Sequence, residues 1–238
     1  MVCQIFIDPH RRLWQTRSMG WPRTLALVRH AESEGNVRGV NERAAYEVAT
    51  HRYNLTERGR KQAEITGQWL REHYGTFDVR YVSYYNRSAE TMRIMCPDEH
   101  VYEDPRLAEA QRGIWHTMTA AQMQERFPEE VARKAKEGLY HYRPWGGENW
   151  PDIELRIHSF LGTLSRDYDD QNVLIVVHGH WLILFRRLIE HFSIDEAVQQ
   201  YEHHVTENAS VTVFEDRREN GKSRLAFKEH VVPWQGQA

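Results

Sequence analysis

Two short, uninterrupted apolar runs stand out in the amino-acid sequence. Thr24–Val28 and Asn172–Val177 each have the length of a β-strand, and neither alternates between apolar and polar residues. This pattern is typical of strands that are buried on both faces, as in the centre of a parallel sheet. A third strand is predicted at Phe77–Ser83, and a short extended segment follows at Val101–Glu103.

Helical patterns lie between these runs. The segment that begins with the N-cap residue Thr56 places its apolar residues near one side, which predicts a surface helix. Further helices are predicted over Asn86–Met95, Trp150–Tyr168 and Trp181–His191. Strands and helices therefore alternate along most of the chain.

This alternation predicts an α/β fold with three layers, α/β/α, in which helices cover both faces of a mostly parallel central sheet. Two late strands, Ser210–Glu215 and Arg224–Val232, are predicted to pair antiparallel across the turn at Glu219–Gly221. Residues 114–150 interrupt the alternation with helical pieces, and we expect them to form an insertion over one end of the sheet.

Length and composition favour a single domain. The chain has 238 residues, of which 40% are hydrophobic, and this is enough for one sizeable core. We expect residues 21–238 to form this domain and residues 1–20 to be a poorly ordered extension. The longest apolar stretch, Val173–Phe185, is interrupted by His178 and is too short to cross a membrane.

Net charge and cysteine content restrict the ligands and the cellular compartment that the protein can have. The formal net charge of −3 argues against a surface that binds nucleic acid or an anionic membrane, so an anionic ligand has to be bound locally. Cys3 and Cys96 match no metal or redox spacing, and residues 1–20 lack the pattern of a signal peptide. Together these features indicate a cytoplasmic protein. The sequence pattern specifies no oligomeric state.

Polar residues follow the predicted strands. Arg29 and His30 follow the first strand, and His178 follows the later apolar run. Arg87 lies in the first turn of the helix after the third strand, and Glu109 follows the short extended segment. Because ligands of open parallel sheets bind at the carboxyl ends of strands, we expect these side chains to face one crevice.

These residue types suit phosphoryl transfer. The guanidinium groups of Arg29 and Arg87 match phosphoryl oxygens, and we assign them to binding and to stabilising the transition state. A neutral imidazole is a competent nucleophile, and His30 is the predicted one. His178 would add a donor from its ring, and the backbone amides that begin at Gly179 would face the anion.

Glu109 is the predicted general acid, which protonates the leaving oxygen and then activates water as a base. A carboxyl that stays protonated at neutral pH needs a raised pKa, which we expect here. The alternative is a structural ion pair with Arg106 or Arg112. The spacing His178-Gly-His180 also occurs in metal sites, but no further ligand motif accompanies it. We therefore expect no metal and assign His180 to the border of the phosphate pocket.

The motifs that carry these residues resemble those of the histidine phosphatase superfamily, also called the phosphoglycerate mutase-like family. They are Leu27–Asn36, Leu55–Ala63, Ser83–Thr91, Leu107–Glu109 and Val177–Gly179. The resemblance implies that His30 becomes phosphorylated and that no metal or organic cofactor is needed. It also implies a site formed by Arg29, Asn36, Arg87, Glu109 and His178.

Two departures from the family pattern bear on the activity. Ala31 stands where a glycine usually follows the nucleophilic histidine. Mutases of the family usually have arginine and tyrosine after the acid glutamate, whereas Ala110 and Gln111 stand here. The primary hypothesis is therefore a phosphatase that acts on phosphate monoesters of small molecules or on other phosphorylated substrates. A 2,3-bisphosphoglycerate-dependent phosphoglycerate mutase and a non-catalytic phosphate-binding scaffold are the alternatives.

Substrate choice is predicted to depend on the insertion, which we expect to form a lid over the pocket. Its side chains that can stack on or bind a substrate are Trp115, His116, Arg126, Arg133, Lys134, Tyr140, Tyr142, Arg143 and Trp145. Among these we expect Tyr142 and Arg143 to determine which natural substrates are preferred. The loop of residues 37–53 is the alternative location.

Overall fold

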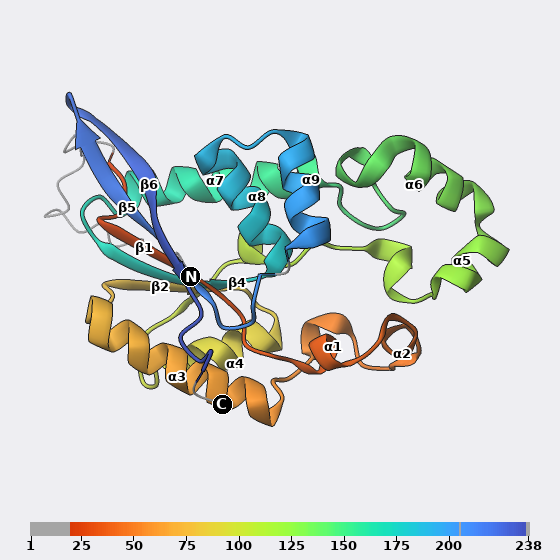
Figure 1. The fold of residues 1–238 in the computed structure, drawn as a ribbon, viewed down its shortest axis with the longest axis horizontal. Helices are drawn as coiled ribbons and strands as arrows, with labels where there is room; N and C mark the ends of the chain where they lie inside the picture. The colour runs from red at the N-terminus through yellow and green to blue at the C-terminus, as the bar shows by residue number, and fades with distance from the viewer. Residues whose placement is uncertain (1–19, 205, 237–238) are drawn as a thin grey trace, which may run out of the picture.

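A computed structural model describes residues 20–204 and 206–236, so the prediction of an extension over residues 1–20 falls almost entirely outside the described residues. In the described part, six strands form one sheet in the order β3-β2-β4-β1-β5-β6 (Figure 1). The strands are β1 Thr24–Arg29, β2 Val79–Val82, β3 Tyr102–Glu103, β4 Asn172–Val177, β5 Val211–Glu219 and β6 Lys222–Val231.

Four neighbouring strands of the sheet run parallel. β3 pairs with β2, β2 with β4 and β4 with β1 in parallel, whereas β5 is antiparallel to β1 and β6 is antiparallel to β5. Asn220 and Gly221, which join β5 to β6, both have positive φ angles, as a tight hairpin turn requires. The predicted hairpin and the mostly parallel sheet are therefore confirmed.

Helices cover both faces of the sheet. The α-helices are α1 Glu34–Val37, α2 Val40–Ala45, α3 Glu57–Tyr74, α4 Asn86–Met95, α5 Ala120–Arg126, α6 Pro128–His141, α7 Trp150–Asp167, α8 Gly179–Glu190 and α9 Ile194–His203. The short 3-10 helices are η1 Thr50–Arg52, η2 Pro105–Leu107 and η3 Gly113–His116. α7 and α8 lie on one face and α3 and α4 on the other, while α1, α2, α5 and α6 extend beyond one end of the sheet (Figure 1). The three-layer prediction is confirmed, although α1, α2 and α9 are not among the predicted helices.

Burial on both faces explains the uninterrupted apolar runs. In β1, Leu25 and Leu27 belong to the core formed with α7 and α8, whereas Ala26 and Val28 belong to the core formed with α3 and α4. All four side chains have an exposed fraction of 0%. A polar residue at any of these positions would lie in one of the two cores, so the strand cannot alternate.

The first turn of α3 packs directly on the backbone that follows β1. The hydroxyl of Thr56 caps the helix by accepting from the Gly59 amide at 3.0 Å, and it donates to the Glu32 carboxylate at 2.7 Å. A Cβ atom at Gly59 would lie 2.0 Å from the carbonyl oxygen of Glu32. Glycine is therefore required at position 59 for this close approach.

Within residues 20–204 and 206–236, no helix is both long enough and apolar enough to cross a membrane.

We predict opposite effects on stability for two glycine substitutions in helices. Gly59→Ala should lower the free energy of unfolding by about 1–3 kcal/mol, because its Cβ would overlap the Glu32 backbone. Gly162→Ala in α7 should raise it by up to about 1 kcal/mol, because nothing lies within 4 Å of the added Cβ and alanine favours a helix. Urea unfolding of both variants tests this, and equal stabilities would contradict the close packing of α3.

Candidate active site

The parallel pairing of β1 with β4 brings two histidines together. Arg29 is opposite Val177 in the register, and the amide of His30 donates to the Val177 carbonyl at 2.9 Å. The next residues, His30 and His178, therefore leave the sheet side by side, and their ring centroids are 5.2 Å apart.

His30 is held as one neutral tautomer. Its Nδ1 lies 2.8 Å from the carbonyl oxygen of Ala31, which can only accept, so Nδ1 carries the proton. Nε2 therefore keeps its lone pair, and Arg87 Nε donates to it at 3.0 Å. Burial of the ring and the nearby charge of Arg87 hold the pKa of His30 well below its ordinary value.

Arg87 bridges the two imidazoles. A second nitrogen of its guanidinium lies 3.2 Å from His178 Nδ1, and a third donates to the carbonyl of Thr50 at 2.8 Å. Because the guanidinium can only donate, His178 Nδ1 accepts, and its protonated Nε2 lies 2.8 Å from the hydroxyl of Ser83. Burial and the charge of Arg87 hold the pKa of His178 well below its ordinary value.

His178 therefore differs from the expectation that its ring donates to a bound anion. Its exposed fraction is 0%, and both ring nitrogens are engaged by Arg87 and by the hydroxyl of Ser83. In this arrangement the ring positions Arg87 and offers no free donor.

Uncommitted donors surround the place where an anion would bind. Arg29 donates to the carbonyl of Thr206, but its Nε is buried and has no hydrogen-bond partner among the described residues. The helix α8 begins at Gly179 after His178, whose side chain does not cap it. The first amides of a helix have no acceptor within the helix and attract negative charge.

Glu109 lies near these donors as an ionised carboxylate. Its Oε1 accepts from the Ala110 amide at 2.9 Å and lies 3.4 Å from His180 Nδ1. Burial alone would raise the pKa of the carboxyl, but His180, His178 and Arg87 outweigh it and hold the pKa well below its ordinary value. The expectation of a raised pKa is therefore wrong for the free protein, because these neighbours stabilise the anion.

A cavity of about 520 Å³ connects these groups. Of the predicted site residues, it is lined by Arg29, His30, Asn36, Arg87, Glu109, Gly179 and His180. The amide oxygen of Asn36 accepts from the amide and hydroxyl of Ser33 and from Asn208, so its NH₂ group is left to donate. His178 lies behind the wall, next to Arg87.

The cavity also contains residues that were not predicted as site residues. They are Ser33, Gly35, Arg112, Ile183, Tyr201, Glu202, His204 and Thr206, together with Arg43, Thr50 and Tyr53 of the 37–53 loop, the alternative location for substrate selection. Several of them come from α2 and from the end of α9, two helices that were not predicted. The capping box of α9, in which Ser193 and Glu196 cap each other, is the sequence signal that could have revealed this helix.

Few of the predicted lid residues reach the cavity. Only Trp115 and His116 of the nine line it. The hydroxyl of Tyr142 accepts from Trp115 Nε1 at 2.8 Å and donates to Glu130 at 2.9 Å, and Arg143 forms an ion pair with Asp152. Tyr142 and Arg143, which are expected to determine substrate preference, therefore do not line the cavity, because contacts within the 114–150 segment and with α7 engage them.

In the part of the chain that the structure describes, no group of three or more His, Cys, Asp or Glu side chains is arranged to hold a metal ion.

The sequence is similar to those of several curated proteins. Phosphoserine phosphatase 1 of Hydrogenobacter thermophilus is 32% identical over 157 residues, which cover 65% of this chain and 70% of that protein. The 2,3-bisphosphoglycerate-dependent phosphoglycerate mutase of Bartonella bacilliformis is 28% identical over 185 residues, which cover 75% of this chain and 86% of that protein. Two other curated relatives are longer proteins, of which the match covers 30% and 32%.

The fold is shared with solved structures. The crystal structure of the alpha-ribazole phosphatase from Shigella flexneri aligns with a TM-score of 0.67 and 25% identity, over 86% of this chain and 95% of that one. Residues 25–227 match the family described as the histidine phosphatase superfamily, branch 1. This match covers all of the sheet except its first residue and the last residues of β6, and it includes every strand end that contributes to the cavity. The chain therefore belongs to branch 1 of the histidine phosphatase superfamily.

Proposed function

We propose that the protein is a phosphatase that hydrolyses phosphate monoesters through a phosphohistidine intermediate on His30. The observation that carries this proposal is the tautomer of His30: Nδ1 donates to the Ala31 carbonyl, so the lone pair on Nε2 faces Arg87. A buried, neutral imidazole with a positioned lone pair is a competent nucleophile at neutral pH.

Binding of the phosphoryl group would replace one hydrogen bond. In the free protein Arg87 donates to His30 Nε2, the atom that has to attack phosphorus. Phosphoryl oxygens are stronger acceptors than an imidazole, so they would draw the Arg87 guanidinium away and free the lone pair. Arg29 Nε and the first amides of α8 supply further donors to the same oxygens.

The reaction would proceed in two displacements. First, His30 Nε2 forms a bond to phosphorus, the ester P–O bond breaks, and Glu109 gives its proton to the leaving oxygen. Second, the Glu109 carboxylate takes a proton from water, the water oxygen attacks phosphorus, and the P–N bond breaks to release inorganic phosphate.

Glu109 would acquire its proton together with the substrate. Its pKa is low in the free protein because His180, His178 and Arg87 outweigh the effect of burial. A phosphate dianion bound beside Arg87 would offset its positive charge and repel a second negative charge, which would raise the pKa of the carboxyl. The acid role is thus tied to an occupied site.

The first prediction concerns the nucleophile. Brief reaction with a substrate followed by quenching should trap an alkali-stable, acid-labile phosphoryl group on His30, located by mass spectrometry. His30→Ala should lower kcat/KM by about 10⁴-fold or more, because a member of the catalytic unit is removed.

The matched control is His158→Ala, since His158 is an exposed histidine of α7 outside the cavity. A label on another residue, or unchanged turnover in His30→Ala, would refute the assignment. Phosphate binding without any turnover of the wild type would favour the non-catalytic scaffold.

The second prediction concerns Glu109. Glu109→Gln keeps the shape of the side chain but removes the proton, so hydrolysis of an alkyl phosphate should fall by about 10²–10⁴-fold. Hydrolysis of p-nitrophenyl phosphate should fall much less, because its leaving group needs little protonation. The value of kcat/KM for each ester checks this, because it reports only the steps up to departure of the leaving group and is independent of the later hydrolysis in which Glu109 acts as the base. Equal losses of kcat/KM on both esters would argue against a proton donor.

The third prediction separates phosphatase from mutase. Ala110 is buried without a polar side chain, and Gln111 Nε2 donates to the hydroxyl of Tyr85 at 2.8 Å, so neither offers a cation to a released phosphoglycerate. With 2,3-bisphosphoglycerate present, we expect net release of phosphate and negligible interconversion of 2- and 3-phosphoglycerate. Efficient interconversion in this assay would favour the mutase.

A further inference from the structure

Two buried polar atoms in the cavity are not used by the proposed chemistry. Among the described residues, six buried side-chain N or O atoms lack a hydrogen-bond partner, and three of these belong to residues that line the cavity: Arg29, Tyr53 and His116. Arg29 Nε lies at the end of the cavity that also contains His30 and Arg87, where the phosphoryl group is proposed to bind. We call this the phosphoryl end. The hydroxyl of Tyr53, a residue with an exposed fraction of 3%, and Nε2 of His116 remain without a partner or a role. A buried polar group without a partner is costly, and a ligand is one way to satisfy it.

Two arginines of the same cavity lack a carboxylate partner. Arg43 of α2 and Arg112, which precedes η3, both line the cavity. Within residues 20–204 and 206–236, no carboxylate oxygen lies within 4.0 Å of either guanidinium. Arg43 donates to the Gly35 carbonyl at 3.3 Å, and Arg112 donates to the Tyr201 hydroxyl at 3.4 Å. Most of their donors therefore remain available.

The charges of Arg43 and Arg112 affect the pKa values of Tyr53 and His116. Burial and the charges of Arg112 and Arg43 lower the pKa of His116 to about 4, so the ring is neutral at physiological pH. Burial raises the pKa of the Tyr53 hydroxyl more than Arg43 lowers it, so this group keeps its proton. The charge of Arg43 acts on both, which links the Tyr53 side of the cavity to the His116 side.

The part of the cavity around Arg43 and Arg112 has an excess of positive charge. The only carboxylates among the lining residues are Glu109 and Glu202, the latter near the end of α9. Glu109 faces the phosphoryl end with Arg29 and Arg87. Arg43 and Arg112 are then opposed only by Glu202, so one positive charge is left over where the leaving group of the ester would lie.

We propose that the leaving group of the natural substrate carries a second anionic group, a carboxylate or a second phosphate, bound by Arg43 and Arg112. Tyr53 and His116 donate hydrogen bonds to the same group. The inference rests on the proposed phosphatase function, because binding of the phosphoryl group next to His30 determines which part of the ligand reaches Arg43 and Arg112.

Matched pairs of esters test this assignment. The compounds 3-phosphoglycerate and glycerol 3-phosphate differ only by a carboxylate in place of a hydroxymethyl group, and fructose 1,6-bisphosphate differs from fructose 6-phosphate by a second phosphate. At fixed ionic strength, the member of at least one pair that carries the second anionic group should have a kcat/KM about tenfold or more above the member that lacks it. The pair with the larger ratio shows whether the site takes a carboxylate or a phosphate.

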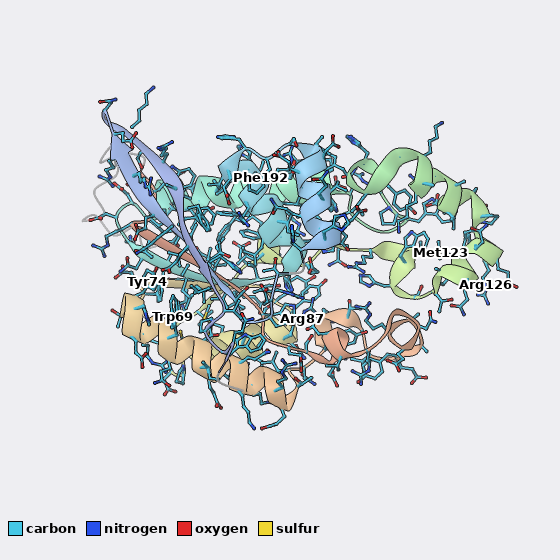
Figure 2. All side chains as sticks on the ribbon, in the orientation of Figure 1. Trp69, Tyr74, Arg87, Met123, Arg126 and Phe192 are labelled. Carbon is cyan, nitrogen blue, oxygen red and sulfur yellow. The ribbon has the colours of Figure 1, made fainter. Side chains whose placement is uncertain are left out.

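Substitution of the two arginines tests whether they cause this preference. Arg43→Gln and Arg112→Gln should each lower kcat/KM for the preferred ester with a second anionic group by about tenfold, and should leave kcat/KM for the ester that lacks this group within about twofold. Arg126→Gln is the matched control, because Arg126 lies at the end of α5, far from Arg87 (Figure 2), and does not line the cavity. Equal kcat/KM within both pairs, or equal losses on both members in the arginine variants, would overturn the proposal.

Failure of the phosphatase function has a different signature, which is the absence of phosphate release from every ester, p-nitrophenyl phosphate included. In that case calorimetric binding to the wild type decides. An ester with the second anionic group that binds about tenfold more tightly than the ester without it, with this difference lost in Arg112→Gln, would support the second anionic subsite. Equal affinities, or no binding of either pair, would overturn it.

Discussion

One chain of hydrogen bonds beneath the cavity determines the chemistry of the site. Because Arg87 can only donate, both imidazoles that it contacts have to accept, and each holds its own proton on the opposite nitrogen. The His178 proton lies toward Ser83, and the His30 proton lies toward the Ala31 carbonyl. The direction of every bond follows from the single charged group at the centre. Reversing any one of them would leave a buried donor facing a donor.

The same arginine ties the acid to the nucleophile through electrostatics. It disfavours a proton on His30 and helps to keep Glu109 ionised, so the free site holds a neutral nucleophile and a charged carboxylate. A bound phosphate dianion would relieve both effects at once, because it offsets the positive charge that causes them. The low pKa of Glu109 in the free protein is thus compatible with the proposed acid role, provided that the proton arrives with the substrate.

Features with a local cause could be predicted from the sequence. The burial of β1 and β4 on both faces forces an uninterrupted apolar run, and the order of the strand ends places His30, Arg87 and Glu109 around one cavity. Features that depend on distant partners could not. The ring of His178 is turned by Ser83, a residue 95 positions away, and no periodicity in the sequence reports such a contact.

The acid and the 114–150 segment illustrate the same limit. The pKa of Glu109 depends on His180, whose ring lies 4.3 Å from that of Tyr201, on a helix that the apolar pattern does not predict. Tyr142 has the composition of a substrate-binding residue, yet its hydroxyl is engaged by Trp115 and Glu130. Composition identifies which side chains could bind a ligand, but the packing of the segment decides which of them are free to do so.

The phosphoryl end of the cavity and the end around Arg43 and Arg112 are formed by different kinds of secondary-structure element. This difference affects how substrate specificity could change. The phosphoryl end stands on the ends of β1 and β4 and on the start of α8, all anchored in the core, whereas Arg43 and Arg112 stand on short surface helices or beside them. Substitutions among the surface elements should therefore alter the fit of the leaving group more readily than the chemistry. The separation is incomplete, because Arg87 donates to the carbonyl of Thr50 in η1, three residues before Tyr53. A movement of Tyr53 that shifted this short helix would therefore also shift an acceptor of Arg87, which would couple the proposed recognition of the leaving group to the placement of the nucleophile.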